Sequence, residues 1–348
     1  AKLSRHRVRA DGAVGDDPVA ETRTMQTLAV PGHLNVLRCI EDFGPDRDRV
    51  FYWAILEFAD GGDLFDFIAH QHDLNSPGSV HQSVKLYGYQ LCLGVQYVHS
   101  QGFVHLDLKP ENAVLVEPEA PGQPKLLKLI DFGVALPYKT PDGQIQLFNH
   151  FAGTYHYAAP EVFRCRPTEA KHAELGVQTT VRAPHEPYDP RLADAWSVGV
   201  ILLLFVVGHH LWQRPDNSNQ WFTQVYTGQL RVLLKKFRWN HLFTEDLIDL
   251  LSRLLCPAEQ RLNMDQVLQH PFFNGLAQHF AHHHAYTSPV FNSSSSSSTT
   301  TNSNFVNPTT FPQPLPPTHL PVHLPTLPSG TSTHPPNTND HQTQQQPD

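Results

Sequence analysis

One short stretch constrains this chain more than any other. The eight residues His105-Leu-Asp-Leu-Lys-Pro-Glu-Asn112 carry an aspartate, a lysine and an asparagine, and Asp131-Phe-Gly133 begins nineteen residues after Asn112. Carboxylate and amide oxygens are hard ligands that suit Mg²⁺. An acid next to a lysine can orient a hydroxyl and support a negatively charged group. The fold must bring these two segments together for them to act on one reacting group.

Composition limits the class of protein. The 348 residues allow about two domains and a tail, and the hydrophobic content of 40% supports a buried core. The net charge is −8 with only 25 Lys and Arg, which argues against a nucleic-acid binder, because such a protein is expected to be basic. The cysteines form no CxxC pair, which indicates reduced thiols in a cytosolic protein and neither disulfides nor a zinc site. They are Cys39, Cys92, Cys165 and Cys256.

No segment is expected to cross a membrane. The N-terminus has no apolar core like that of a signal peptide. The most apolar run, 198–207, is too short to span a bilayer and directly follows a stretch that contains Asp194 and Trp196. We therefore expect a buried core helix there.

The apolar pattern divides the chain into a strand-rich start and a helical remainder. Residues 1–57 predict short strands and one helix, and 50–58 (VFYWAILEF) is apolar and aromatic enough for a buried strand. Turn residues at 59–62 indicate a change of direction. Apolar residues at helical spacing from 84 to 98 predict a long helix with Gly102 as its C-cap.

The remaining segments are expected to be a hairpin, helices and a tail. The Pro-rich stretch 117–124 is expected at a hairpin tip. Helices are expected at 192–207, 221–227 and 244–255, the last with a stripe of leucines. From residue 276 the chain is rich in Ser, Thr, Asn, Pro and His and nearly lacks charge, so we expect disorder, with the histidines at 282–284 solvated.

Residues 1–275 resemble a eukaryotic protein kinase of the Ser/Thr type. The resemblance rests on the two segments above and on Gly153-Thr-Tyr-His-Tyr-Ala-Ala-Pro-Glu161, which is similar to the end of the family's activation segment. It implies that Asp107 orients the substrate hydroxyl. Lys109 is then the lysine that contacts the transferring phosphate, and Thr154 hydrogen-bonds near both.

The same resemblance implies that Asn112 and Asp131 hold Mg²⁺, which bridges the phosphates of ATP. It also implies structural partners. Glu161 is expected to form a buried ion pair with Arg261, and Asp194 is expected to anchor the backbone of the catalytic loop.

A nucleotide site is implied by the first sixty residues and a few later ones. Lys2 looks like the strand lysine that holds the ATP α and β phosphates, and Glu21, nineteen residues on, looks like its partner in the following helix. Leu56 to Ala59 resembles the hinge between two lobes. The nucleotide contacts that the resemblance implies are Lys2, Glu21, Leu56 as gatekeeper, the backbone of Glu57 and Ala59 at adenine, Asp63 at the ribose, and Val114.

The chain departs from the family pattern in three places. The Gly-rich loop expected upstream of Lys2 does not occur, so we expect a fragment, and a protein that has lost its phosphate cover is the other interpretation. The segment 164–184 is additional and would lie near the substrate-docking surface. Leu106 replaces an arginine that in the family binds a phosphorylated activation-loop residue. Because leucine cannot pair with phosphate, activity is expected not to depend on phosphorylation of that loop.

The expected fold class is α+β. It is a two-lobed protein-kinase-like fold with a small strand-rich N-lobe, incomplete here, and a larger helical C-lobe. The predicted divisions are 1–58, 59–275 and a disordered tail at 276–348. The stretch 61–66 (GGDLFD) places the chain loosely with the calmodulin-dependent and AMP-activated kinase group.

The leading interpretation is a protein Ser/Thr kinase that transfers the γ-phosphate of ATP, with Mg²⁺, to Ser/Thr hydroxyls of protein substrates. Asp63 and Glu111 predict a preference for basic residues before the target. The alternative is a pseudokinase or scaffold that binds partners through the same fold, and a small-molecule phosphotransferase is a third interpretation. We expect a monomeric kinase domain without nucleic-acid partners or a membrane span. The expected location is cytoplasmic, with nuclear entry left open.

Overall fold

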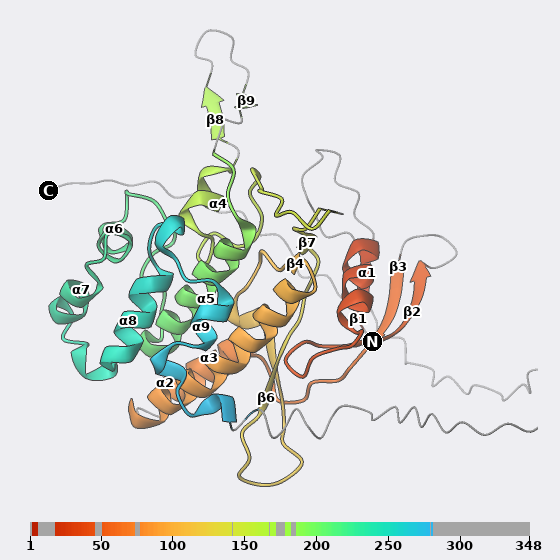
Figure 1. Cartoon of the computed structure of the whole chain (residues 1–348), viewed down its shortest axis with the longest axis horizontal. Helices are drawn as coiled ribbons and strands as arrows, with labels where there is room; N and C mark the ends of the chain where they lie inside the picture. The colour runs from red at the N-terminus through yellow and green to blue at the C-terminus, as the bar shows by residue number, and fades with distance from the viewer. Residues whose placement is uncertain are drawn as a thin grey trace, which may run out of the picture. The chain divides into compact units, whose positions relative to one another are not determined.

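The first part of the chain forms three strands and one helix, and the part that follows is mainly helical (Figure 1). The computed structural model describes residues 2–5, 18–45, 51–73, 77–140, 142–166, 168–171, 178–181, 186–278 and 280. These residues all belong to a compact unit that spans 1–289, and 290–348 form a second unit.

The described strands are β1 (Lys2–Arg5), β2 (Cys39–Pro45), β3 (Phe51–Leu56), β4 (Phe103–Val104), β5 (Ala113–Val116), β6 (Leu126–Leu129), β7 (Leu136–Pro137), β8 (Thr168–Lys171) and β9 (Gln178–Val181). The α-helices are α1 (Pro18–Leu28), α2 (Leu64–Asp73), α3 (Pro77–Ser100), α4 (Pro160–Arg164), α5 (Pro190–Val207), α6 (Gln220–Tyr226), α7 (Leu230–Lys236), α8 (Glu245–Leu254) and α9 (Met264–Leu268). Short 3-10 helices are η1 (Pro110–Asn112), η2 (Asn240–Leu242), η3 (Ala258–Gln260) and η4 (Pro271–Phe273).

The N-terminal sheet has three antiparallel strands in the order β1-β3-β2, and α1 packs against β2 and β3. The predicted strand at 50–58 exists, but only one of its faces is buried. Tyr52 and Ala54 line a small cavity with residues of α1, whereas Trp53 and Ile55 are 40% and 38% exposed. Successive side chains of a strand point to opposite faces, so a single covering helix buries only alternate residues.

The segment after α1 ties this sheet to the helical part of the unit. Val36 forms a parallel bridge with Leu129 of β6. The buried side chain of Asn35 donates hydrogen bonds to the Leu127 carbonyl (2.8 Å) and to Gln90 (3.2 Å). Backbone and amide groups buried in this way need partners, so these bonds fix where the two parts meet.

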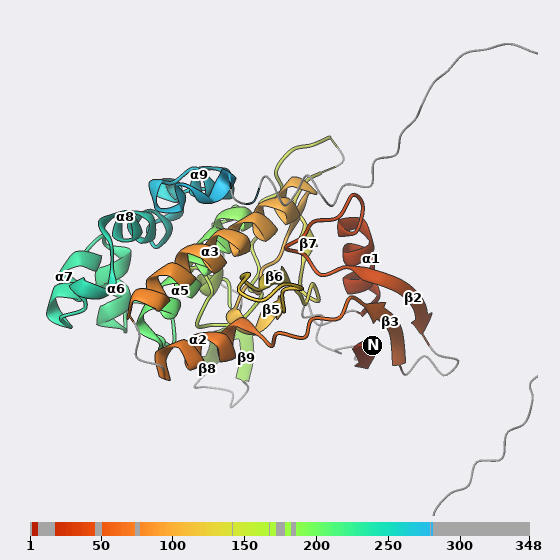
Figure 2. The ribbon, with the colours of Figure 1, turned by 90° about the horizontal axis from the view of Figure 1, so that it is seen from below.

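Helix α3 is the centre of the helical part and packs against α5, α9 and β6 (Figure 2). Gly88 permits the close contact with α5, because a Cβ at this position would lie 2.6 Å from the Leu202 side chain. Helix α3 ends at Ser100, and Gly102 follows with a φ of 85°. The predicted helix end and its glycine cap are therefore confirmed.

Helix α5 is the most apolar element. It is long and apolar enough to cross a membrane by composition alone, but 89% of that window is buried inside the protein, as in a core helix. It begins at Pro190, two residues before the predicted start, because the Asp189 side chain caps it by accepting the Arg191 N–H at 3.0 Å. Gly208 ends it with a φ of 77°.

Most other sequence-based elements occur close to their predicted bounds. Strands β5 and β6 pair as an antiparallel hairpin whose tip contains 117–124. Helix α8 is capped by Thr244, and its leucines Leu247, Leu250, Leu251 and Leu254 are fully buried. Helices α2, α4, α7 and α9 were not predicted.

The additional segment and the C-terminal boundary are partly described. Strands β8 and β9 pair as an antiparallel hairpin within 164–184. Residues 276–278 and 280 are helical, and the ring of Phe280 packs 5.5 Å from that of Tyr89, so structure continues past the predicted boundary at 275. The predicted disordered tail from 281, including the histidines at 282–284, lies outside the described residues. All four cysteines are free and buried.

Candidate active site

A buried carboxylate shapes the loop that carries the eight-residue motif. Asp194 of α5 is 0% exposed and accepts the backbone N–H groups of His105 (2.9 Å) and Leu106 (2.8 Å). The same carboxylate pairs with His99 Nε2 at 2.9 Å. Leu106 has a φ of 64°, a left-handed conformation that these contacts stabilise. The loop between β4 and η1 is therefore held by the core helix, as the resemblance implied.

Asp107 lies at the centre of a polar cluster. Its Oδ2 accepts a hydrogen bond from Lys109 Nζ at 2.7 Å, and its Oδ1 accepts one from the Thr154 hydroxyl at 2.7 Å. Lys109 Nζ also donates to the Thr154 hydroxyl at 3.3 Å. The Asp107 side chain is 14% exposed. The structure thus brings the three predicted catalytic residues together, with the acid still open to a substrate.

Asn112 directly precedes β5 and Asp131 follows β6 by two residues, so both lie at the open end of the β5–β6 hairpin. Asn112 Nδ2 donates to the Asp107 carbonyl (2.9 Å) and to Asp107 Oδ2 (3.3 Å), which leaves the amide oxygen as the atom that can bind a metal. The Ile130 N–H donates to the Asn112 carbonyl at 3.0 Å, so Asp131 is next to a residue bonded to Asn112. Asp131 has a left-handed φ of 64°.

These two side chains fit Mg²⁺. One carboxylate and one amide oxygen would be a sufficient protein contribution, because Mg²⁺ is usually bound by one or two carboxylates together with substrate phosphates and water. Across the part of the chain that the structure describes, no three His, Cys, Asp or Glu side chains gather into a metal site of their own. The donor set therefore suits a metal that arrives together with a phosphate ligand.

His105 connects the two chemical segments, and sequence reasoning gave it no role. Its ring is fully buried, and its Nδ1 accepts the Asp107 N–H at 3.3 Å. Nε2 therefore carries the proton and donates to the Ile130 carbonyl at 3.0 Å. Its place in the motif was the available signal.

Gly153 brings the activation segment against the catalytic loop. Its φ is 87°, and an added Cβ would lie 2.2 Å from the Leu106 carbonyl oxygen. Only glycine can make this approach in this conformation, and the approach places Thr154 next to Asp107.

The whole arrangement matches a known family. Residues 2–273 match the protein kinase domain family. The chain belongs to the protein kinase family. Relatives include "Serine/threonine-protein kinase chk-1" of Caenorhabditis briggsae, which is 30% identical over 71% of this chain and 43% of its own length.

Two further relatives extend this likeness. "Serine/threonine-protein kinase RAD53" of Saccharomyces cerevisiae is 29% identical over 72% of this chain and 27% of its own length. "CBL-interacting protein kinase 11" of Oryza sativa subsp. japonica is 31% identical over 67% of this chain and 38% of its own length. The chain thus spans less than half the length of each of these three relatives.

The nucleotide side of this kinase domain is only partly described. Glu21 is buried on α1 and lines a small cavity with Ala54 and Leu56 of β3. The backbone of Lys2 pairs with Ala54, which brings β1 beside this cavity. The Lys2 side chain lies outside the described residues, so its pair with Glu21 stays a prediction.

The hinge residue Glu57 has a structural role that was not predicted. Its N–H donates to the Arg38 carbonyl at 2.9 Å, and its carboxylate pairs with Lys128 Nζ at 3.0 Å. The Lys128 side chain is 6% exposed, so this is a largely desolvated cation held at the junction with β6. The Glu57 carbonyl is then the backbone group left for adenine, and the contacts of Leu56, Glu57 and Ala59 with adenine stay predictions.

Asp63 also has a structural task. Its Oδ1 accepts the Asp66 N–H at 2.8 Å and so caps α2. It forms an antiparallel bridge with Val114 of β5, which places both predicted nucleotide contacts side by side. The second carboxylate oxygen is the atom available for the predicted ribose contact.

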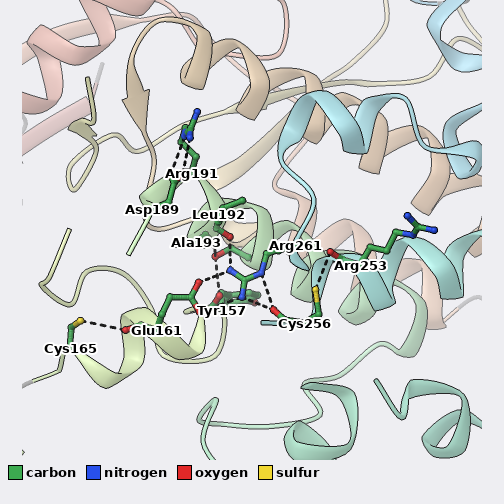
Figure 3. A network of polar contacts seen from close by, with 11 residues as sticks. Tyr157, Glu161, Cys165, Asp189, Arg191, Leu192, Ala193, Arg253, Cys256 and Arg261 are labelled. Carbon is green, nitrogen blue, oxygen red and sulfur yellow. Dashed lines mark hydrogen bonds and ion pairs between the residues drawn. The ribbon is translucent and has the colours of Figure 1, made fainter. Parts of the chain in front are cut away.

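The predicted ion pair between Glu161 and Arg261 is present and buried (Figure 3). Arg261 Nη1 lies 2.5 Å from Glu161 Oε1, and Nη2 lies 3.3 Å from Oε2. The guanidinium also donates to the carbonyls of Cys256 and Leu192 and lies 5.0 Å from the Trp196 ring centroid. All of its donors are directed to the end of the activation segment and to the surrounding core.

Proposed function

We propose that this chain is the catalytic part of a protein Ser/Thr kinase that uses ATP and Mg²⁺. The observation that carries the proposal is the Asp107 carboxylate, held by Lys109 on one oxygen and by Thr154 on the other. A carboxylate fixed in this way can accept a hydroxyl proton, and the adjacent ammonium can support a transferring phosphate. The relatives named as serine/threonine-protein kinases support the same assignment.

The chemistry needs little beyond positioning. Asp107 accepts the proton of the Ser or Thr hydroxyl and aligns its oxygen with the γ-phosphate. Lys109, bonded to that carboxylate, stabilises the charge that develops on the phosphoryl oxygens. Asn112 and Asp131 would hold Mg²⁺, which supplies charge neutralisation at the phosphates when bound. Thr154 keeps the activation segment in place around the acid.

Replacing Asp107 by Asn tests the proposal. Phosphate transfer to a Ser/Thr peptide library should fall by about 10²–10⁴-fold, the usual contribution of general acid–base catalysis. ATP binding, measured by equilibrium dialysis, should persist because Asn112 and Asp131 are unchanged. Asp142→Asn in the exposed part of the activation segment is the matched control and should retain transfer. Undiminished transfer by Asp107→Asn would refute the assigned role, and a wild-type chain that binds ATP without transfer would favour the scaffold.

We further propose that substrates carry basic residues before the target, that the domain is monomeric, and that it is cytoplasmic. The first proposal is supported by the exposed carboxylate of Glu111 beside the catalytic loop. A peptide array that showed acidic residues preferred on that side would overturn it. Sedimentation and imaging of the tagged full chain test the other two.

A further inference from the structure

A cavity of about 390 Å³ opens between the end of α5 and the start of α6. Its volume is at the small end of the range for ligand-binding pockets. Its wall combines the nearly buried ring of Trp212 with the exposed side chains of Gln213 and Arg214. Five of the eight lining residues carry polar or charged groups, namely His210, Gln213, Arg214, Ser218 and Asn219, so the cavity suits a polar side chain or a small polar ligand.

Two of the polar residues of this cavity, Arg214 and Asn219, can donate hydrogen bonds to a ligand. Asn219 uses its Oδ1 to accept the N–H groups of Trp221 (2.9 Å) and Phe222 (3.0 Å), so its NH₂ group is the part left for a ligand. Arg214 adds a guanidinium, and no carboxylate among the described residues pairs with it. A guanidinium with amide donors favours a carboxylate or a phosphate.

The loop between α5 and α6 contains one acid. Asp216 accepts hydrogen bonds from the Ser218 N–H at 3.0 Å and from the Ser218 hydroxyl, and it does not line the cavity. These hydrogen bonds come from neutral groups, so Asp216 keeps its negative charge, and Arg214 carries the one formal charge among the residues that line the cavity.

A short series of contacts joins the cavity to the catalytic acid. His210 lines the cavity, and its Nε2 lies 3.2 Å from the Tyr157 hydroxyl. The Tyr157 N–H donates to the Thr154 carbonyl at 3.0 Å, and the Thr154 hydroxyl bonds to Asp107. The cavity is therefore linked, through the buried Tyr157, to the residue that holds the catalytic acid.

We infer that this cavity is a subsite for an anionic side chain of the protein substrate, whose charge pairs with Arg214. The inference rests on the proposed kinase function and adds to it a specificity determinant on the activation-segment side of the acceptor. The ligand chemistry is a carboxylate or a phosphate, so glutamate, aspartate and phosphoserine are the candidates. Burial and the nearby His156 and His209 lower the pKa of His210 to about 4, so Arg214 is the cation at neutral pH.

The test uses the full chain and peptides with one serine acceptor, in which Glu, phosphoserine or Gln is moved through the flanking positions. The wild type should prefer Glu or phosphoserine over Gln at one position by about fivefold, the upper end for an accessible ion pair. Arg214→Glu should abolish that preference. Lys236→Gln, which removes an exposed cation of α7 outside the cavity, should keep it. Comparison of the Glu and phosphoserine peptides identifies which anion the subsite takes.

Binding gives a second measurement that needs no turnover. In the Asp107→Asn background, calorimetry should show tighter binding of the anionic peptide than of its Gln counterpart, and Arg214→Glu should remove the difference. The proposed subsite would be refuted if peptides with Glu, phosphoserine or Gln were phosphorylated and bound equally well at every position. It would also be refuted if the preference for an anion survived Arg214→Glu. A wild-type chain that phosphorylates no peptide contradicts the proposed kinase function, and the calorimetric comparison still decides the subsite.

Discussion

Gly153 packs directly against the carbonyl oxygen of Leu106, so closely that an added Cβ would lie 2.2 Å from it. The contact joins the activation segment to the residue before the catalytic acid. It therefore couples the placement of Thr154 to the shape of the catalytic loop.

Gly153→Ala should separate these two segments. The left-handed φ of 87° adds about 1–3 kcal/mol of strain for a side chain, and the clash displaces Thr154 from Asp107. Since small misplacements near reacting groups are costly, activity should fall about 100-fold. Peptide phosphorylation and thermal unfolding measure the two effects. Gly122→Ala is the control, with a φ of 83° and nothing within 4 Å, and should lose some stability but no activity; equal losses in both variants would contradict this account.

The pair of Glu161 and Arg261 should matter for stability more than any surface pair. Arg261→Gln leaves a buried carboxylate without its cation, so the free energy of unfolding should drop by about 3–5 kcal/mol. Urea denaturation measures the change. Arg231→Gln is the matched control, because Arg231 and Glu245 are 60% and 77% exposed, and it should change stability by less than about 1 kcal/mol. Similar costs for both variants would show that burial of the first pair has no special effect.

Phosphatase treatment should leave the kinase activity of the chain unchanged. Leu106 cannot pair with phosphate, and two hydroxyls of the activation segment are already engaged. The Tyr138 hydroxyl is buried and donates to the His99 carbonyl at 2.8 Å, and the Thr140 hydroxyl donates within its own turn. Thr140→Ala should likewise retain activity. A large loss after dephosphorylation, mapped by mass spectrometry to this segment, would be incompatible with the prediction.

His210 should make the protein less stable in acid. Its pKa in the folded protein is about 4, against an ordinary value of 6.5, because burial and then His156 and His209 disfavour its charged form. The unfolded chain therefore takes up this proton first, so the stabilisation is complete above about pH 6.5 and declines as the pH falls towards 4. His210→Gln should flatten the dependence of the melting temperature on pH in that window. Parallel curves for the two proteins would rule the effect out.

The sequence was most informative where function depends on locally spaced polar residues. The cluster of Asp107, Lys109 and Asn112 lies within six residues, so its members could be recognised together. The strand at 50–58 was found from its apolar run, but the run could not show that Trp53 and Ile55 lie on an exposed face. That depends on which element covers the sheet, which is a tertiary property.

Partners that are distant along the chain were mostly missed. Lys128 pairs with Glu57, and His99 pairs with Asp194, across 71 and 95 residues of chain. No local periodicity connects such positions. Glu161 and Arg261 were an exception only because the family resemblance supplied the pair. The short helix α7 was also missed, although α6, which has seven residues as well, was predicted.

The hydrogen bonds to Asp194 tie the catalytic loop to the core. We therefore expect local unfolding of this loop to cost about as much free energy as local unfolding of α5. The amides of His105 and Leu106 donate to a side chain of α5, a helix in which 15 of 18 residues are buried, so we expect these amides to exchange with solvent mainly when that helix opens. Hydrogen exchange at these two amides should therefore be as slow as in α5 itself. A segment without regular secondary structure thus unfolds together with the most protected part of the domain.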